Sequence, residues 1–163
     1  MAGFFVNGKD DEDYVKLYDN LDVNVQKLIN AAIEVRRNAY CPYSSFAVGA
    51  AIRTTDGSIY TGCNIENGAF VAGICAERVA AAKAITEGKR EFVDCAVVAS
   101  VDAKHQFTTP CGVCRQFLSE FVVNKDISIY ATVPINPPLR VLCTSVMGLL
   151  PKSFSCPINR NAL

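Results

Sequence analysis

The spacing of apolar positions changes along the chain, and each change predicts a different secondary-structure element. From Asp22 to Cys41 apolar residues recur at helical spacing, and the proline that follows at position 42 disfavours continuation of a helix. Residues 46–54 and 58–64 are strand-like runs joined through Asp56-Gly57, a dipeptide suited to the positive φ angles of a tight hairpin. We therefore expect a helix followed by two antiparallel strands.

The remainder of the chain alternates helix-like and strand-like segments. Residues 76–87 are alanine-rich and end at Gly88, a good residue just past a helix, and helical spacing returns over residues 111–123. The three strand-like segments in this part of the chain are 92–100, 127–133 and 139–144. This order predicts an α/β fold, a three-layer α/β/α sandwich built on a mixed five-stranded sheet.

Length and hydrophobic content indicate one domain. The chain has 163 residues, of which 50% are hydrophobic, enough for one well-buried core. Residues 1–20 mix acidic residues with a few aromatics without a lasting period, so we interpret them as an N-terminal extension or a short appended helix. Residues 21–163 are expected to form the single domain.

Charge excludes some partners. Sixteen basic residues balance 16 acidic ones, so a nucleic acid would meet no overall basic surface, and a small-molecule partner fits better. The N-terminus holds only the short apolar run Phe4 to Val6, and no stretch approaches the length of a membrane span. We expect a soluble, cytoplasmic protein that binds neither membrane nor nucleic acid.

The eight cysteines are interpreted as reduced thiols, because nothing marks the chain for secretion. Cys95 and Cys143 lie in apolar strand-like runs, where a free cysteine behaves as a small hydrophobe. His105, the sole histidine, lies in a polar, turn-rich stretch and is expected to be a loop residue. A metal site in this chain would therefore be built largely from cysteine.

Two short segments contain candidate metal-binding and catalytic residues, and each lies where a loop leads into a predicted helix. The first is Cys75-Ala76-Glu77 and the second contains Cys111 and Cys114. A helix start favours the thiolate, the form that binds metal, and cysteines three apart share one helical face. Cys75 and Glu77 are two apart, so convergence requires Cys75 to lie at the very start of its helix.

Three thiolates suit Zn²⁺ and leave its fourth tetrahedral position open, as catalysis requires. Other interpretations stay open from these residues alone. Cys111 and Cys114 also fit a dithiol redox pair, and Glu77 alone fits a solvated helix residue. A structural zinc site would need a fourth ligand from among Cys41, Cys63, Cys95, Cys143 and Cys156.

Five motifs in order resemble the family of small, homotetrameric cytidine deaminases. The resemblance runs from about Val25 to Phe154, and the motifs are Cys41-Pro42-Tyr43-Ser44, Phe46-Ala47-Val48-Gly49-Ala50-Ala51, Gly62-Cys63-Asn64-Ile65-Glu66-Asn67, Cys75-Ala76-Glu77-Arg78 and Pro110-Cys111-Gly112-Val113-Cys114-Arg115-Gln116. The resemblance implies hydrolytic deamination of cytidine and deoxycytidine to uridine and deoxyuridine, with release of ammonia, in pyrimidine salvage.

The same resemblance implies a role for each site residue. One Zn²⁺ per subunit would be bound by Cys75, Cys111 and Cys114, and it would activate the water that attacks C4 of the pyrimidine. Glu77 would carry the protons. Arg78 would donate hydrogen bonds to the thiolates and so offset their negative charge.

Substrate contacts are also implied by the resemblance. Asn64 and Glu66 would hold the ribose hydroxyls, the backbone N–H of Ala76 would meet the base carbonyl, and Phe46 would lie against the ring. Phe154 would close the pocket of a neighbouring subunit in a homotetramer. Without the resemblance, Phe46 is interpreted as a core residue and Asn64 as an ordinary strand-end residue.

One departure from the family and several competing substrates remain. Phe70 stands where the family often has a tyrosine, so a hydroxyl contact is expected to be missing there. The chemistry would also suit a polynucleotide cytosine, an aminonucleoside antibiotic or a nucleotide. Asn64 and Glu66 favour a free nucleoside, because a carboxylate repels an approaching phosphate and the neutral chain offers no path for a strand.

Overall fold

The computed structural model describes residues 14–100, 107–134 and 140–156. The expectation for His105 falls outside these residues. Within them, no helix combines the length and the apolar character that a bilayer crossing requires.

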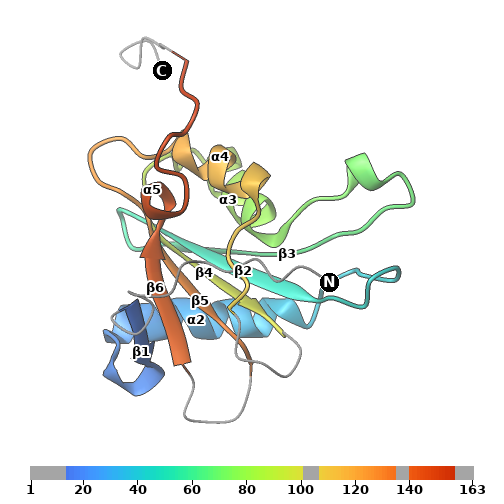
Figure 1. The fold of residues 1–163 in the computed structure, drawn as a ribbon, viewed down its shortest axis with the longest axis horizontal. Helices are drawn as coiled ribbons and strands as arrows, with labels where there is room; N and C mark the ends of the chain where they lie inside the picture. Colours follow the sequence, from blue (N-terminus) through green and yellow to red (C-terminus); the bar gives the residue numbers. More distant parts are fainter. Residues whose placement is uncertain (1–13, 101–106, 135–139, 157–163) are drawn as a thin grey trace.

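The strands within the described residues join one mixed sheet in the order β1-β6-β5-β4-β2-β3 (Figure 1). Only β4 and β5 pair in parallel among the described strands, and every other neighbouring pair is antiparallel. The strands are β1 (Val15–Leu17), β2 (Val48–Thr54), β3 (Ile59–Cys63), β4 (Phe92–Ala99), β5 (Ser128–Thr132) and β6 (Arg140–Ser145). The predicted hairpin is confirmed, with Gly57 at φ +86° in its turn.

The sheet has six strands, so the prediction of five is wrong by one. The additional strand, β1, lies within the proposed extension and pairs antiparallel with β6, Val15 opposite Leu142 and Leu17 opposite Arg140. A strand of three residues is too short to show an alternating pattern, and its pairing depends on backbone groups supplied by a distant segment. A 3₁₀ turn, η1 (Tyr18–Asn20), follows it. The domain boundary at residue 20 stays a prediction.

Helices cover both faces of the sheet, which confirms the three-layer α/β/α sandwich (Figure 1). One face packs against α2, and the other packs against α3, α4 and α5. The helices are α2 (Val23–Arg36), α3 (Ala76–Thr86), α4 (Gly112–Ser119), α5 (Val146–Leu149) and the 3₁₀ turn η2 (Phe70–Ala72). Gly88, at φ +81°, follows α3 as predicted.

Two apolar cores lie on the two faces of the central strands. On β4, Ala96 and Val98 pack with the α2 core, whereas Cys95 and Val97 pack with the core beneath α3 and α4. This alternation is the period of two expected for a strand covered on both faces. Cys95 is fully buried, as predicted, and Cys143 packs half-buried at the edge of the α2 core.

Close backbone contact fixes α3 on the sheet. A Cβ added at Gly62 of β3 would lie 2.4 Å from the carbonyl oxygen of Ala76 and 2.5 Å from the backbone nitrogen of Ala80. Only glycine permits this approach, which holds the first turn of α3 directly against the hairpin. The start of α3 is therefore positioned by strand backbone.

Candidate active site

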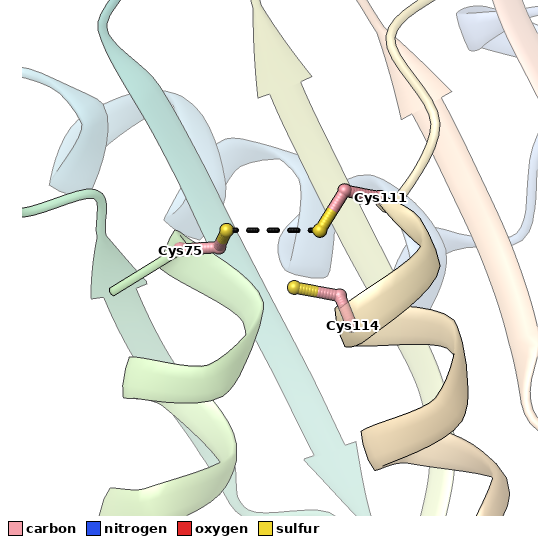
Figure 2. A group of neighbouring side chains, drawn as sticks. All are labelled: Cys75, Cys111 and Cys114. Carbon is pink, nitrogen blue, oxygen red and sulfur yellow. Dashed lines mark hydrogen bonds between the residues drawn. The ribbon is translucent and has the colours of Figure 1, made fainter. Parts of the chain in front are cut away.

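Two cysteines occupy equivalent places at the starts of two helices. Cys75 is the N-cap of α3 and Cys111 is the N-cap of α4, while Cys114 lies in the first turn of α4. The requirement that Cys75 stand at the very start of its helix is met. All three thiols point into the space between the two helix starts (Figure 2).

The spacing of the three sulfur atoms suits zinc. They lie within 4.8 Å of one another, and the Sγ atoms of Cys75 and Cys111 are 3.8 Å apart. Two ligands ~2.3 Å from one zinc at tetrahedral corners are themselves about 3.8 Å apart. Among the described residues, no other cysteine, histidine or carboxylate joins this group. The cluster therefore fits one Zn²⁺ with three protein ligands and an open fourth position, and it does not extend to a four-cysteine structural site.

Hydrogen bonds polarise the thiols. The pKa of Cys75 is lowered to about 5, first by the hydrogen bond from Cys114 and then by Arg78, whose Nη2 lies 3.6 Å from the Cys75 sulfur. The pKa of Cys114 is raised, first by its hydrogen bond to Cys75 and then by burial. Nε of Arg78 is buried without a hydrogen-bond partner among the described residues. A dithiol redox pair requires only two cysteines. In this structure a third thiol and the guanidinium group of Arg78 lie at the same place, which favours a metal site over a redox pair.

Glu77 is buried in the first turn of α3, with 4% of its surface exposed. Burial raises the pKa of its carboxyl group, because the charged form loses its hydration, and the nearby Cys75 thiolate adds to this effect. The alternative of a solvated helix residue is therefore wrong. Burial thus makes the protonated form of this carboxyl group easier to reach than in an exposed glutamate, as a group that takes up and releases protons requires.

A pocket of about 620 Å³ opens beside the thiols, within the size range of small-molecule sites. It is lined by residues from the β2 entry loop, the segment after β3, the start of α3 and the start of α4. The sequence-predicted residues among them are Phe46, Asn64, Glu66, Cys75, Ala76, Glu77, Arg78 and Cys111. The structure thus brings together residues that lie far apart in the sequence.

Asn64 fixes the entry to β2. Its Oδ1 accepts a hydrogen bond from the backbone N–H of Val48 at 2.8 Å, and its Nδ2 donates to the carbonyl of Phe46 at 2.9 Å. Phe46 keeps 38% of its surface exposed and lines the pocket, so its interpretation as a core residue is wrong. The β-strand begins only at Val48, and Phe46 lies in the preceding loop.

Glu66 holds the same loop from the other side. Its carboxylate accepts hydrogen bonds from the backbone N–H groups of Tyr43, at 2.9 Å, and Ser44, at 3.2 Å, and from the Ser44 hydroxyl. The Ser44 hydrogen bond is the largest cause of the lowered pKa of Glu66. Sequence reasoning assigned no part to Tyr43 or Ser44 beyond their motif, because their partner lies more than twenty positions away.

Ala76 and Phe154 occupy contrasting positions. Ala76 is fully buried at the first position of α3, where a backbone N–H has no acceptor within its own helix. Phe154 is 75% exposed and is absent from the described residues that line its own chain's pocket.

Phe70, the departure from the family pattern, lines the pocket. Its ring meets the Tyr43 ring edge-on, with centroids 6.3 Å apart.

Arg115 is a residue that the sequence analysis quoted without a role. Its Nε donates to the carbonyl of Pro110 at 2.7 Å and its Nη2 to the hydroxyl of Thr109 at 2.9 Å, and Nη1 reaches the carbonyl of Leu149 at 3.1 Å. The guanidinium therefore holds the loop that leads into Cys111. In the sequence, only its position directly after Cys114 indicated that Arg115 could contribute to the site.

Comparison with known proteins agrees with this geometry. Residues 23–130 match the family model described as the cytidine and deoxycytidylate deaminase zinc-binding region. A cytidine deaminase of Sporosarcina psychrophila is 44% identical over 133 residues, which cover 82% of this chain and 93% of that protein. One from Halalkalibacterium halodurans is 50% identical over 105 residues, 64% of this chain and 76% of that protein.

Solved structures give the same result. The crystal structure of cytidine deaminase from Burkholderia pseudomallei matches with a TM-score of 0.70 and 39% identity, covering 78% of this chain and 97% of that one. That of cytidine deaminase from Mycobacterium tuberculosis matches with a TM-score of 0.66 and 33% identity, covering 83% and 100%. With a shared fold, a matching family model over most of its length and a three-thiol cluster at two helix starts, the chain belongs to the cytidine and deoxycytidylate deaminase family.

Proposed function

We infer that the chain catalyses the hydrolytic deamination of cytidine and deoxycytidine to uridine and deoxyuridine with release of ammonia, a reaction of pyrimidine salvage. The observation that carries this inference is the buried carboxyl group of Glu77 beside three convergent thiols in one pocket. The relatives named cytidine deaminase support the choice of substrate.

Cys75, Cys111 and Cys114 hold one Zn²⁺ per chain. When bound there, zinc supplies the Lewis acidity that lowers the pKa of water towards neutrality. Three thiolates carry more negative charge than the ion neutralises. Arg78 offsets the excess, in keeping with its Nη2 lying 3.6 Å from the Cys75 sulfur.

Glu77 carries the protons of the reaction. It takes one proton from the attacking water and delivers it to ring N3 of the pyrimidine. It then takes the second proton from the hydroxyl group added at C4 and passes it to the amino group, which leaves as ammonia. Its burial supports this role, because burial raises the pKa of the carboxyl group and so favours its protonated form more than in an exposed glutamate.

The nucleoside is bound by the pocket wall. Asn64 and Glu66 bind the ribose hydroxyls, the Ala76 N–H binds the base carbonyl and Phe46 lies against the ring. Glu66 already accepts three hydrogen bonds from residues 43–44, which leaves part of its acceptor capacity for a hydroxyl. Its negative charge disfavours a 5′-phosphate, so a free nucleoside is preferred to a nucleotide or a polynucleotide.

The working form is a homo-oligomer, a tetramer, in the cytoplasm. Phe154 of one subunit closes the pocket of a neighbour. Support comes from its exposure within its own chain and from two further exposed apolar side chains near the pocket, Phe70 at 83% and Val71 at 97%. Apolar side chains that lie next to one another on the surface, as the consecutive residues Phe70 and Val71 do, are more often covered by another chain than isolated ones are.

Ultraviolet absorbance separates this function from its alternatives. Purified protein should convert cytidine and deoxycytidine, and should act poorly on free cytosine and on cytidine monophosphate. Free cytosine lacks the ribose that Asn64 and Glu66 bind. Preference for the monophosphate would contradict the role given to Glu66, and failure to convert any of the four compounds would contradict the function itself.

A further inference from the structure

The side chain of Gln116 makes a two-point contact with the main chain of Phe154. Nε2 of Gln116 donates to the Phe154 carbonyl at 2.8 Å, and Oε1 accepts from the Phe154 N–H at 3.2 Å. A primary amide that uses its donor and its acceptor on one residue fixes the orientation of that residue as well as its distance. Phe154 is thus attached to α4, two residues past Cys114.

Few other contacts among residues 14–100, 107–134 and 140–156 orient this segment. Residues 153–156 belong to no helix or strand, and the Phe154 side chain is 75% exposed, so its ring is not held by burial in its own chain. Arg115 binds the carbonyl of Leu149 at 3.1 Å and anchors the beginning of the segment to α4. Gln116 supplies the second anchor, directly at the residue whose ring projects outward.

We propose that Gln116 is a positioning residue that sets the direction of the Phe154 ring and thereby how tightly the neighbouring subunit's pocket closes on the nucleoside. This inference rests on the proposed function, in which Phe154 closes that pocket. Among the described residues, Gln116 is not one of those that line the pocket, and its side chain forms hydrogen bonds with Phe154 and Ser119, so its effect on the neighbouring pocket is expected to pass through Phe154.

The test compares the zinc-loaded oligomers of Gln116→Ala, Phe154→Ala and the double variant with the unaltered protein. Gln116→Ala should raise KM for cytidine about fivefold to tenfold and leave kcat within about twofold, because two hydrogen bonds that orient a binding group are lost and the reacting groups are untouched. Zinc content should stay at one per chain. The double variant should be no worse than Phe154→Ala, because a residue that acts only through Phe154 has no effect once that ring is absent.

Two further variants sharpen the comparison. Nε2 of Gln116 also lies 3.4 Å from the Ser119 hydroxyl, so Ser119→Ala removes a neighbouring contact and should leave KM unchanged. Gln116→Glu keeps an acceptor for the Phe154 N–H but sets a carboxylate oxygen against the Phe154 carbonyl. It should therefore raise KM as the alanine variant does, and it provides the test if the alanine variant does not fold.

The outcomes distinguish a failure of this inference from a failure of the proposed function. An unchanged KM in Phe154→Ala would contradict the proposal that Phe154 closes a neighbouring pocket, and the role of Gln116 would fail with it. A raised KM in Phe154→Ala but an unchanged KM in both Gln116 variants would overturn only the positioning role. Loss of zinc in Gln116→Ala, or an effect that multiplies fully with that of Phe154→Ala, would overturn it as well.

Discussion

The sulfur atoms of Cys75 and Cys111 lie 3.8 Å apart, although the two residues are the N-caps of different helices and are separated by 36 positions in the sequence. Both thiols thus stand at positive helix ends, where the thiolate is favoured. The separation equals the edge of a tetrahedron around zinc. The metal site is therefore formed between α3 and α4. Its geometry depends on the relative positions of these two helices.

Removal of any one of the three thiols should abolish or strongly weaken zinc binding. Cys75→Ala, Cys111→Ala and Cys114→Ala should each lose zinc or bind it far more weakly, because two thiolates cannot complete the site. Metal analysis of the purified variants is the measurement. Cys156→Ser, which changes an exposed cysteine outside the cluster, is the control and should keep its zinc. Full occupancy in all three alanine variants would contradict the site.

Glu77→Gln should keep its zinc and lose most of kcat. The amide preserves the shape of the buried side chain but cannot carry protons, and loss of such a group lowers the rate by about 10²–10⁴-fold. Steady-state kinetics with a parallel zinc determination checks this. Glu87→Gln, which changes a carboxyl group just past the end of α3, is the matched control. Near-normal turnover in Glu77→Gln would remove this residue from proton transfer.

Gly62→Ala should disturb α3 and the site together. The new Cβ would lie 2.4 Å from the Ala76 carbonyl oxygen, so helix and strand must separate. Overpacking of this kind costs about 1–3 kcal/mol of unfolding free energy, which urea denaturation measures. Zinc affinity should fall too, since Cys75 moves with the helix. Gly112→Ala, where no atom lies within 4 Å of the added Cβ, should retain full stability, and equal losses in both variants would refute the steric explanation.

Asp94→Ala should destabilise the sheet. Asp94 is 2% exposed and forms an ion pair with Arg53 on the neighbouring strand, a contact that is the main cause of the raised pKa of Arg53. Removing one member of a buried pair costs about 3–5 kcal/mol, and partial exposure of Arg53 favours the lower end. Lys89→Ala, which breaks the exposed pair with Asp56, should cost far less, because water and salt screen an exposed ion pair. Chemical denaturation compares the two, and similar costs would contradict the importance of burial.

Mixed oligomers of Phe154→Ala and Glu77→Gln should be more active than the sum of the parents. The first variant has an intact zinc site and no closing ring, and the second has the reverse. Co-expression of differently tagged chains places some intact sites beside intact rings, which requires closed symmetric assembly. Deamination by the purified mixed species is the measurement. Absence of any gain, or sedimentation as a monomer, would contradict the shared pocket.

The sequence predicted those parts of the fold that local pattern determines. The apolar periodicity of α2 and the continuous apolar run of β4 gave elements close to the observed ones. The end of α4 shows the limit of this approach. Apolar spacing continues to Phe121, which packs on Phe92 with ring centroids 4.8 Å apart, but the helix itself ends at Ser119. A buried position is thus no proof that the helical hydrogen bonds continue.

The site divides in the same way. The thiols and Glu77 were candidates because they lie in short motifs at helix starts, and their roles were implied by the resemblance of these motifs to the deaminase family. The contacts that fix the pocket wall and the Phe154 segment were not found, since each joins residues distant in sequence. Glu66 binds Ser44, and Gln116 binds Phe154. Hydrogen bonds between residues distant in sequence leave no pattern in the local sequence. Their partners can be identified only from the folded structure.

The pairing of β1 with β6 has a consequence for synthesis of the protein. Leu17 lies opposite Arg140, so the ribosome must add more than a hundred residues before β1 meets its partner. At about 5–20 residues per second, this strand waits roughly 6–25 s. Once β5 (Ser128–Thr132) has been made, it too lacks one neighbour until β6 follows, and the sheet presents an unpaired edge to other nascent chains. The assembly of the sheet is thus completed late, and a chaperone that binds extended segments would have its longest opportunity at the first strand made.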